Sequence, residues 1–297
     1  MLKMCLNPKI AGLQESFSVD GELVKKVTFR IGDREIVKSI RVPCRSCVEC
    51  VIGYSNQWAT RVAAEASCHR ENCFITLTYN DESLPKDNQV AVREVQLFLK
   101  RLRKSLGKKR IRYFACGEYG EKGGRPHYHV IIFGHSFSDR YFLKFDNRKN
   151  PIYRSPSLEK LWTKGFSSVG EVNRDSARYA AKYMQKFMPV GERKPAFTLQ
   201  SRKPAIGYVY AIKHYDEIVK TCGIYQEGKK RSLPPVFKRW YKREGLNIAP
   251  IEDAMALRAF PSTREEDLVA RRLNFVNKFG FWRKNRKGEL ISDVYNI

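Results

Sequence analysis

The chain has 297 residues, and its 56 Lys and Arg residues outnumber its 31 Asp and Glu residues, which gives a formal net charge of +25. A hydrophobic content of 42% excludes a disordered polymer, and no apolar segment approaches the roughly 20 residues that cross a bilayer, so we expect a soluble protein with no membrane partner. The surplus of positive charge favours a polyanion as the partner.

The first fifty residues predict a β-rich region. Apolar and polar residues alternate over residues 23–31 and 36–42, and the Gly32-Asp33 pair between them favours a hairpin. A helix is expected from about Ser55. The N-terminus lacks the apolar segment of a secretory signal, so the eight cysteines are expected in a reducing compartment, where metal binding is more common than disulfide formation.

The next two segments carry strong local signals. Residues 73–79 are rich in β-branched and aromatic side chains and predict a strand. Residues 92–106 predict an amphipathic helix, and the window 93–112 contains nine basic residues and one acidic residue. The cations of this helix either bind a polyanion or form the solvated face of an ordinary helix. They are Lys100, Arg101, Arg103 and Lys104.

The middle of the chain predicts two strands at 111–118 and 127–134, which are joined by a loop rich in glycine. A further strand is expected at 166–172, and Asp175 is expected to cap a helix that ends near Phe187. The pattern weakens near residue 190. The expected organisation is an N-terminal β region at 1–54, a core at 55–190 and a basic C-terminal region at 191–297 that packs on the core and contacts the partner.

Within that C-terminal region, the segment at 238–243 combines basic and aromatic side chains. Lys238 and Arg239 are expected to hold a phosphate backbone. Trp240 and Tyr241 are expected to stack on single-stranded bases.

Two histidines occur in the sequence PHYHVIIFG, as His127 and His129. Residues two apart in a strand point to the same face, so both imidazoles can converge on one ion. If the preceding strand pairs antiparallel with this one, Glu118 can reach the same point. Two histidines and a carboxylate suit a catalytic divalent ion with open positions, whereas the alternative is a pair of half-buried strand histidines.

The sequence YAAKYMQK places Tyr179 and Tyr183 four residues apart, so both phenols project from one face of a helix. Lys182 and Lys186 each follow a tyrosine by three residues. By themselves, such tyrosines usually pack at the edge of a core. Beside a metal and a lysine, however, a phenol of pKa about 10 gains the phenolate character that a nucleophile needs.

Three motifs occur in order, FITLTY at 74–79, GRPHYHVIIFG at 124–134 and YAAKYMQK at 179–186. Together they resemble the motifs of HUH endonucleases. The doubled tyrosine is similar to that of the rolling-circle replication initiators of microviruses. The cysteine run before a Trp-containing helix and the spelling GEYGEKGGRPHYH are similar to the gokushovirus branch of that family.

This resemblance implies an α+β fold with a central antiparallel sheet, flanking helices and a core like that of RRM and ferredoxin-like domains, preceded by the cysteine-rich β region. It implies that His127 and His129 bind Mg²⁺ or Mn²⁺, that Tyr179 and Tyr183 are nucleophiles, and that Lys182 and Lys186 assist them. Glu118 as the third ligand is a choice made on geometry, with Glu121 nearby in the loop.

Cys44, Cys47 and Cys50 form a run of soft ligands, and a structural zinc ion needs four. Cys5 is the preferred fourth ligand because it lies in the same N-terminal region and the resemblance includes an early cysteine. Cys68 and Cys73 are alternatives. The competing interpretation is that these cysteines are reduced and bind nothing.

The function implied is that of a replication initiation endonuclease. Such an enzyme nicks single-stranded viral origin DNA by tyrosine transesterification, retains a 5′-phosphotyrosine link, leaves a 3′-OH for a host DNA polymerase, and rejoins the strand. The chain has no GxxxxGK[ST] phosphate loop, so a host helicase is expected, in the cytoplasm of a bacterial host cell. The alternatives are an HUH relaxase or transposase, and a non-enzymatic zinc-stabilised nucleic-acid-binding protein.

Overall fold

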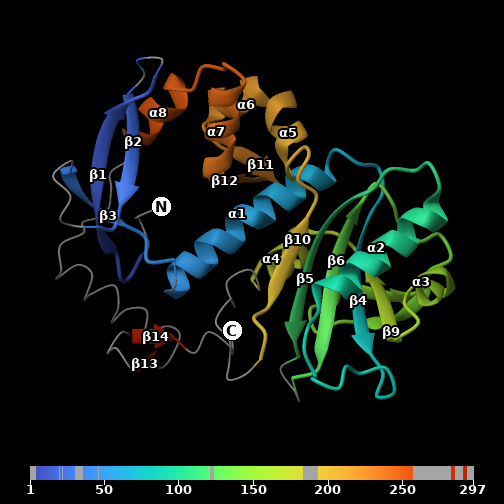
Figure 1. Cartoon of the computed structure of the whole chain (residues 1–297). Coiled ribbons are helices and arrows are strands. Elements are labelled where there is room, and N and C mark those ends of the chain that lie inside the picture. The colour runs from blue at the N-terminus through green and yellow to red at the C-terminus, as the bar shows by residue number, and fades with distance from the viewer. Residues whose placement is uncertain are drawn as a thin grey trace. The chain divides into compact units, whose positions relative to one another are not determined.

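The computed structural model describes residues 5–19, 21, 23–30, 36–45, 47–120, 124–182, 193–256, 282–284 and 290–292. The chain divides into two compact units, one formed by residues 1–53 and 258–297 and the other by residues 54–257 (Figure 1). Within the described ranges, every helix is too short or too polar to cross a membrane.

The first unit contains a three-stranded antiparallel sheet in the order β2-β1-β3. Its strands are β1 (Lys9–Phe17), β2 (Leu23–Thr28) and β3 (Ile36–Val42). The predicted hairpin between the second and third strands is wrong, because each of them pairs with β1. The turn signal at Gly32-Asp33 is local, whereas the pairing partner is a strand further back in the chain that offers hydrogen bonds at both edges. A short hairpin, β13 (Trp282–Lys284) and β14 (Leu290–Ser292), also belongs to this unit.

Few side chains are buried in the first unit. Among its described residues, the buried hydrophobic ones are Cys5, Leu6, Ala11 and Cys47. The half-buried thiols of Cys44 and Cys50 pack against this small cluster. Much of the sheet surface is exposed, so cysteine side chains make up most of the core of this unit.

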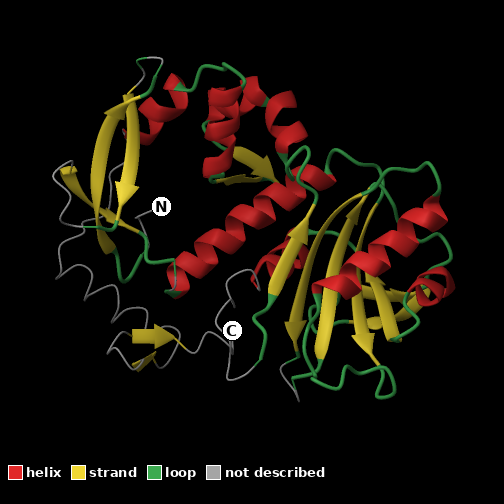
Figure 2. Cartoon of the chain, in the orientation of Figure 1, coloured by secondary structure: helices red, strands yellow, loops and turns green. Residues whose placement is uncertain are grey.

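The second unit is built on a seven-stranded sheet in the order β10-β5-β6-β4-β9-β8-β7, and all neighbouring strands are antiparallel (Figure 2). The strands are β4 (Asn72–Tyr79), β5 (Arg112–Tyr119), β6 (Pro126–Phe133), β7 (Tyr141–Phe145), β8 (Pro151–Arg154), β9 (Gly165–Gly170) and β10 (Phe197–Gln200). The α+β fold with a central antiparallel sheet is therefore confirmed.

Helices pack against both faces of this sheet. On one face, called the α2 face, lie α2 (Val92–Leu106) and α3 (Pro156–Leu161), and the buried stripe of α2 packs on the alternate residues of β4 and β6 that include Leu77 and Val130. On the other, called the α4 face, lie α4 (Arg174–Lys182) and the later turns of α1 (Val48–Ala66). The first helix begins seven residues earlier than the sequence pattern predicts, directly after the cysteine run.

The remaining elements of the second unit form a smaller hydrophobic cluster of their own. They are α5 (Tyr208–Lys213), α6 (Tyr215–Thr221), β11 (Ile224–Gln226), β12 (Lys229–Arg231), α7 (Pro235–Arg243) and α8 (Ala249–Ala256). The boundary expected near residue 190 falls inside the second unit, because β10 pairs with β5.

The C-terminal end of α1 is fixed by a buried carboxylate. Glu65 is 1% exposed, accepts a hydrogen bond from the backbone N–H of Gly207 at 2.8 Å, and pairs with the guanidinium of Arg112 and the imidazole of His69. Burial favours the neutral carboxyl, but the hydrogen bonds with His69 and Gly207 and the charge of Arg112 outweigh it and lower the pKa of Glu65. This carboxylate therefore joins α1, β5 and the segment before α5.

Candidate active site

The register of β5 and β6 decides which side chains meet on the α4 face. Glu118 lies opposite His127, and Cys116 lies opposite His129. Because side chains alternate between faces, Glu118 and both histidines share one face, as the antiparallel pairing proposed from the sequence requires. The structure therefore brings the three predicted ligands together.

The distances among these ligands are short. The Oε1 atom of Glu118 lies 3.0 Å from Nε2 of His127 and 2.8 Å from Nε2 of His129. Glu118 and His129 are buried, and His127 is partly open to solvent. The second carboxylate oxygen of Glu118 is buried and has no hydrogen-bond partner in the described part of the chain.

The outward-facing ring nitrogens are oriented by neighbouring oxygens. Nδ1 of His127 lies 3.2 Å from the carbonyl oxygen of Arg125, and Nδ1 of His129 lies 3.1 Å from Oγ1 of Thr76. A carbonyl and a carboxylate both only accept hydrogen bonds. The His127 imidazole between them must therefore carry two protons or direct an unprotonated Nε2 at a cation.

Burial and pairing shift the titration of the cluster. Burial opposes the charge of Glu118, but the hydrogen bonds with His127 and His129 outweigh it and lower the pKa of the carboxyl. Burial lowers the pKa of His129, and Glu118 only partly offsets this. A carboxylate beside a neutral imidazole is the protonation state that binds a metal ion.

Thr76 is a site residue that the sequence patterns do not predict. It lies in FITLTY on β4, directly opposite His129 in the β4–β6 ladder. Its side chain faces the histidines because residues in register on adjacent strands share a face. The motif itself is visible in the sequence, but the role of its hydroxyl depends on the register.

The tyrosine helix α4 is capped differently from the prediction. The Oδ1 atom of Asn173 accepts a hydrogen bond from the N–H of Ser176 at 2.8 Å, and the Asn173 N–H donates to the Ser176 hydroxyl at 2.9 Å. Asp175 lies within the first turn instead of at the cap and pairs with Arg148 on the surface. Asn173 satisfies the free N–H groups first, because its side chain reaches them from the preceding position.

Tyr179 lies beside the histidines. Its ring centroid is 5.1 Å from that of His129 with the planes nearly perpendicular, and Phe74 stacks on the same imidazole with a centroid distance of 5.3 Å. The Tyr179 side chain is 39% exposed, so a large substrate can reach it. Tyr183 and Lys186 lie outside the described residues, as does the side chain of Lys182.

The cations predicted to hold DNA lie in different surroundings from those expected. Lys100, Arg101, Arg103 and Lys104 are all on α2, on the opposite face of the sheet from the histidines. Arg101 donates to the carbonyl of Leu161 at 2.8 Å and thereby links α2 to α3.

The C-terminal predictions are partly corrected. Lys238 forms an ion pair with Glu252 at 2.8 Å, whereas Arg239 is exposed. Trp240 is 7% exposed and Tyr241 is fully buried in the smaller hydrophobic cluster. The expectation that these two rings stack on bases is therefore wrong, because their apolar faces are used in packing.

Other cations, not singled out from the sequence, lie on the α4 face. Arg174 donates to the side-chain oxygen of Gln226 at 3.1 Å, and Arg178, the residue before Tyr179, is exposed. Arg61 stacks on the Trp58 ring, with its guanidinium carbon 3.7 Å from the centroid. No periodic pattern marks these residues, because they come from separate elements.

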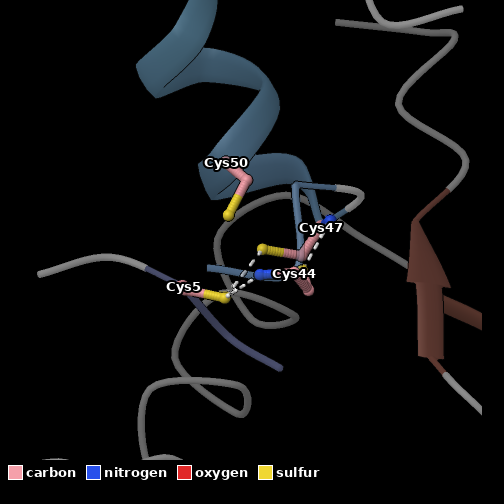
Figure 3. Close-up of side chains that lie close together, drawn as sticks. All are labelled: Cys5, Cys44, Cys47 and Cys50. Atoms are coloured by element: carbon pink, nitrogen blue, oxygen red, sulfur yellow. Dashed lines mark hydrogen bonds between the residues drawn. The ribbon is translucent and has the colours of Figure 1, made fainter. Parts of the chain in front are cut away.

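The cysteine run forms a second cluster of possible ligands, in the first unit (Figure 3). The sulfur atoms of Cys5, Cys44, Cys47 and Cys50 all lie within 4.8 Å of one another. We refer to these residues as the four-cysteine cluster. The alternative fourth ligands are elsewhere, since Cys68 is exposed after the end of α1 and Cys73 is buried in β4.

Comparisons with known proteins agree with this arrangement. Residues 72–188 match the family model of the phage replication-associated protein ORF2, a range that contains the histidine strand and the tyrosine helix. The chain is 30% identical to the replication-associated protein VP4 of Bdellovibrio phage phiMH2K, over 80% of this chain and 77% of that protein.

It is also 31% identical to the replication-associated protein ORF2 of Spiroplasma virus 4, over 81% of each chain. For the replication-associated protein ORF4 of Chlamydia phage 1, the identity is 32% over 77% of this chain and 62% of that protein. No solved structure matches the chain. The chain therefore belongs to the microvirus-like family of phage replication-associated proteins.

Proposed function

We propose that this protein initiates viral DNA replication by nicking single-stranded origin DNA, with a divalent metal ion and Tyr179 as the attacking group. The observation that carries the proposal is the contact between the Tyr179 ring and His129, at a centroid distance of 5.1 Å, beside the carboxylate of Glu118. A nucleophile next to metal ligands is the arrangement that phosphoryl transfer needs.

The three clustered side chains fit a Mg²⁺ or Mn²⁺ ion. Glu118, His127 and His129 would hold it and leave positions open for phosphate oxygens and water. Two observations support the fit, namely the unpartnered buried oxygen of Glu118 within the described residues and the two acceptor groups that flank His127. When bound, the ion polarises the scissile phosphate and neutralises part of its charge.

The residues of the chain supply the covalent step. The phenol of Tyr179 loses its proton to solvent, and its oxygen bonds to phosphorus while the bond between phosphorus and the 3′ oxygen breaks. The leaving 3′ oxygen takes up a proton. The products are a 5′-phosphotyrosine ester and a free 3′-OH, so one ester replaces another and the strand can later be rejoined.

The second tyrosine and the lysines extend this chemistry. Tyr183 follows Tyr179 by four residues and would attack the regenerated origin after one round of synthesis, which releases a closed circle. Lys182 and Lys186 would favour the phenolate forms through their positive charge. We further propose that the 3′-OH is extended by a host DNA polymerase, with a host helicase separating the strands, in the cytoplasm of a bacterial host cell.

The DNA backbone is proposed to lie against the α4 face. Arg178 is exposed one residue before Tyr179, and Arg174 lies one helical turn earlier. A strand that reaches Tyr179 passes these cations directly, whereas the cations of α2 lie across the sheet. We therefore assign the first phosphate contacts to α4 and a supporting role to Lys100 and Lys104.

The test uses single-stranded DNA fragments tiled across the viral genome, incubated with the full-length protein and Mn²⁺ or Mg²⁺. We expect one fragment to form an adduct that survives denaturation, and mass spectrometry to find the phosphate on Tyr179 or Tyr183. Loss of the adduct in the double variant Tyr179→Phe and Tyr183→Phe is expected, while Tyr225→Phe, which alters a similarly exposed tyrosine, keeps it.

Two outcomes would overturn this proposal. The absence of an adduct with every fragment would leave a binding protein without nuclease activity. An adduct that persists without both tyrosines would place the nucleophile elsewhere. The products separate replication from the relaxase and transposase alternatives, because only replication releases closed circles of unit length.

A further inference from the structure

The four-cysteine cluster lies at a junction of chain segments. Cys5 precedes β1, Cys44 follows β3, and Cys50 lies in the first turn of α1 (Figure 3). An interaction that held all four sulfur atoms would tie the start of the N-terminal sheet to its end and to the beginning of the helix.

The spacing of the sulfur atoms suits a metal ion. The sulfur atoms of Cys5 and Cys47 are 4.0 Å apart, and all four lie within 4.8 Å of one another. A tetrahedral zinc ion with Zn–S bonds of about 2.3 Å holds its sulfur ligands about 3.8 Å apart. A disulfide requires about 2.05 Å. The cluster is therefore already close to the size of a tetrathiolate site.

Backbone groups favour thiolates in this cluster. The N–H of Leu6 donates to the sulfur of Cys47 at 3.4 Å. The N–H of Cys44 donates to the sulfur of Cys5 at 3.2 Å, and the N–H of Cys47 donates to the sulfur of Cys44 at the same distance. A hydrogen bond to sulfur stabilises its charged form.

The cluster alone does not support four negative charges. Contact with Cys44 raises the pKa of Cys5, but the hydrogen bonds from Cys47 and Cys50 outweigh it and lower that pKa to about 7. Contact with Cys44 also raises the pKa of Cys47 and of Cys50, to which the other thiols and burial add. The first thiolate therefore forms readily, and the others need a cation among them.

The first unit also needs a source of stability. Its described sheet residues bury only Ala11 completely, and the cluster formed by Cys5, Leu6 and Cys47 is the main buried group. Small folded units with so little apolar burial usually depend on a metal ion, disulfides or a partner. The eight cysteines of this chain, all of which lie in the described ranges, form no disulfide.

We propose that Cys5, Cys44, Cys47 and Cys50 bind one structural zinc ion that stabilises the N-terminal unit and fixes the start of α1. The four protein ligands fill the tetrahedral shell and leave no position for substrate. Zinc at this site therefore acts on folding, and it is independent of the metal ion proposed at the histidines.

The test measures zinc in the full-length protein after purification under reducing conditions and dialysis against a chelator that removes Mg²⁺ and Mn²⁺. We expect about one zinc ion per chain. Cys5→Ser and Cys47→Ser should each lower retained zinc by about tenfold or more, because three thiolates bind zinc far more weakly than four. Cys5→His should restore part of the zinc, since imidazole is also a zinc ligand.

Two sets of controls separate this site from the active site. Cys68→Ser and Cys222→Ser alter thiols outside the cluster and should keep the zinc. The double variant His127→Ala and His129→Ala should also keep it. Cobalt-substituted protein should show thiolate-to-metal charge-transfer absorption in the wild type and the histidine variant, and lose it in Cys5→Ser.

Three results would overturn the proposal. These are wild-type protein that contains no zinc, zinc that is retained in Cys5→Ser and Cys47→Ser, and zinc that is lost in the histidine variant alone. Limited proteolysis adds a structural readout. Removing zinc should expose residues before Gly53 to cleavage while the second unit, which has its own core, stays resistant.

Discussion

The two clusters of metal-ligating side chains differ in ligand chemistry and in the way the fold supports them. Glu118, His127 and His129 project from adjacent strands inside a seven-stranded sheet, whose core exists without them. The cysteines of the N-terminal unit come from segments that flank a sheet with little core, and they form most of that core themselves. The comparison separates ligands that a rigid fold displays from ligands that help make the fold.

The completeness of the two clusters differs as well. Three ligands on a strand surface leave room for a phosphate, and a tyrosine lies beside them. Four thiols within one tetrahedral radius leave no such room. The same chain therefore contains one site suited to chemistry and one suited to stability.

The largest expected effect is on cleavage. Replacing His127 with Ala removes one metal ligand but leaves Glu118 hydrogen-bonded to His129. Cleavage of the origin strand should fall by about 10³-fold or more, which corresponds to the several kcal/mol that a metal ion contributes. The melting temperature and the zinc content should stay close to those of the wild type.

Cys5→Ser is the matched opposite for this measurement. It should reduce zinc content and the stability of the N-terminal unit while leaving the three active-site ligands in place. If His127→Ala retained wild-type cleavage, or lost it only through unfolding seen by calorimetry, the division between the two clusters would fail.

The next effect concerns the other end of the first helix, where a carboxylate replaces the cysteines as the anchor. Glu65→Ala leaves the Arg112 guanidinium and the Gly207 N–H without this partner, and should cost about 3–5 kcal/mol of unfolding free energy. The measurement is urea unfolding at pH 7 followed by circular dichroism. A loss below about 1 kcal/mol would contradict a buried charged anchor.

The pH dependence of that anchor has a defined sign. The folded pKa of Glu65 is lower than its unfolded value of about 4.3, so its stabilisation is fully present above that pH and is lost as the pH falls through the folded pKa. The stability difference between wild type and Glu65→Gln should therefore be constant from pH 7 to about pH 5 and shrink below about pH 4. A difference that grew on acidification would have the wrong sign.

A smaller effect is expected from the hydroxyl that orients His129. Thr76→Val removes the oxygen 3.1 Å from Nδ1 and keeps the shape of the side chain. Loss of such a partner usually costs about 10–100-fold in metal affinity or activity. Mn²⁺ titration of the cleavage rate measures this, and Thr76→Ser should restore it because the hydroxyl is retained. Equal defects in the Val and Ser variants would argue against a role for this hydroxyl.

The smallest effect compares the two faces of the sheet. Arg178→Gln on the α4 face should lower the affinity for single-stranded DNA a few-fold and reduce the salt dependence of binding by about 0.7 in log–log slope. Lys104→Gln, a matched charge change on the α2 face, should have a smaller effect. Fluorescence anisotropy at several salt concentrations measures both. A larger effect of Lys104→Gln would move the DNA path to the α2 face.

Local sequence patterns predict much of this arrangement because they depend on neighbours within one element. The helix at residues 92–106 is predicted with its observed bounds, since its apolar stripe repeats over four turns. The alternation of a strand places both histidines on one face before any fold is known. The three motifs in order also lead to the family that the comparisons support.

Features that depend on distant segments cannot be predicted in this way. A turn signal suggests that β2 pairs with β3, but the strand between them is β1. Trp240 and Tyr241 occur among cations that suggest an exposed surface, yet their rings are buried by elements elsewhere in the chain. In both cases the burial of apolar surface and the pairing of backbone groups outweigh the local signal.

By itself, the sequence determined the chemistry that the chain can present, namely the paired histidines, the tyrosines of YAAKYMQK, the clustered thiols and the positive charge. Only the tertiary structure decided which groups meet. It brought Glu118 to the histidines, Thr76 to the ring of His129, Cys5 to the other thiols, and the cations of α2 to the face away from the site. The physical reason is that side-chain identity and periodicity are local, whereas strand register and packing are selected by the free energy of the whole folded unit.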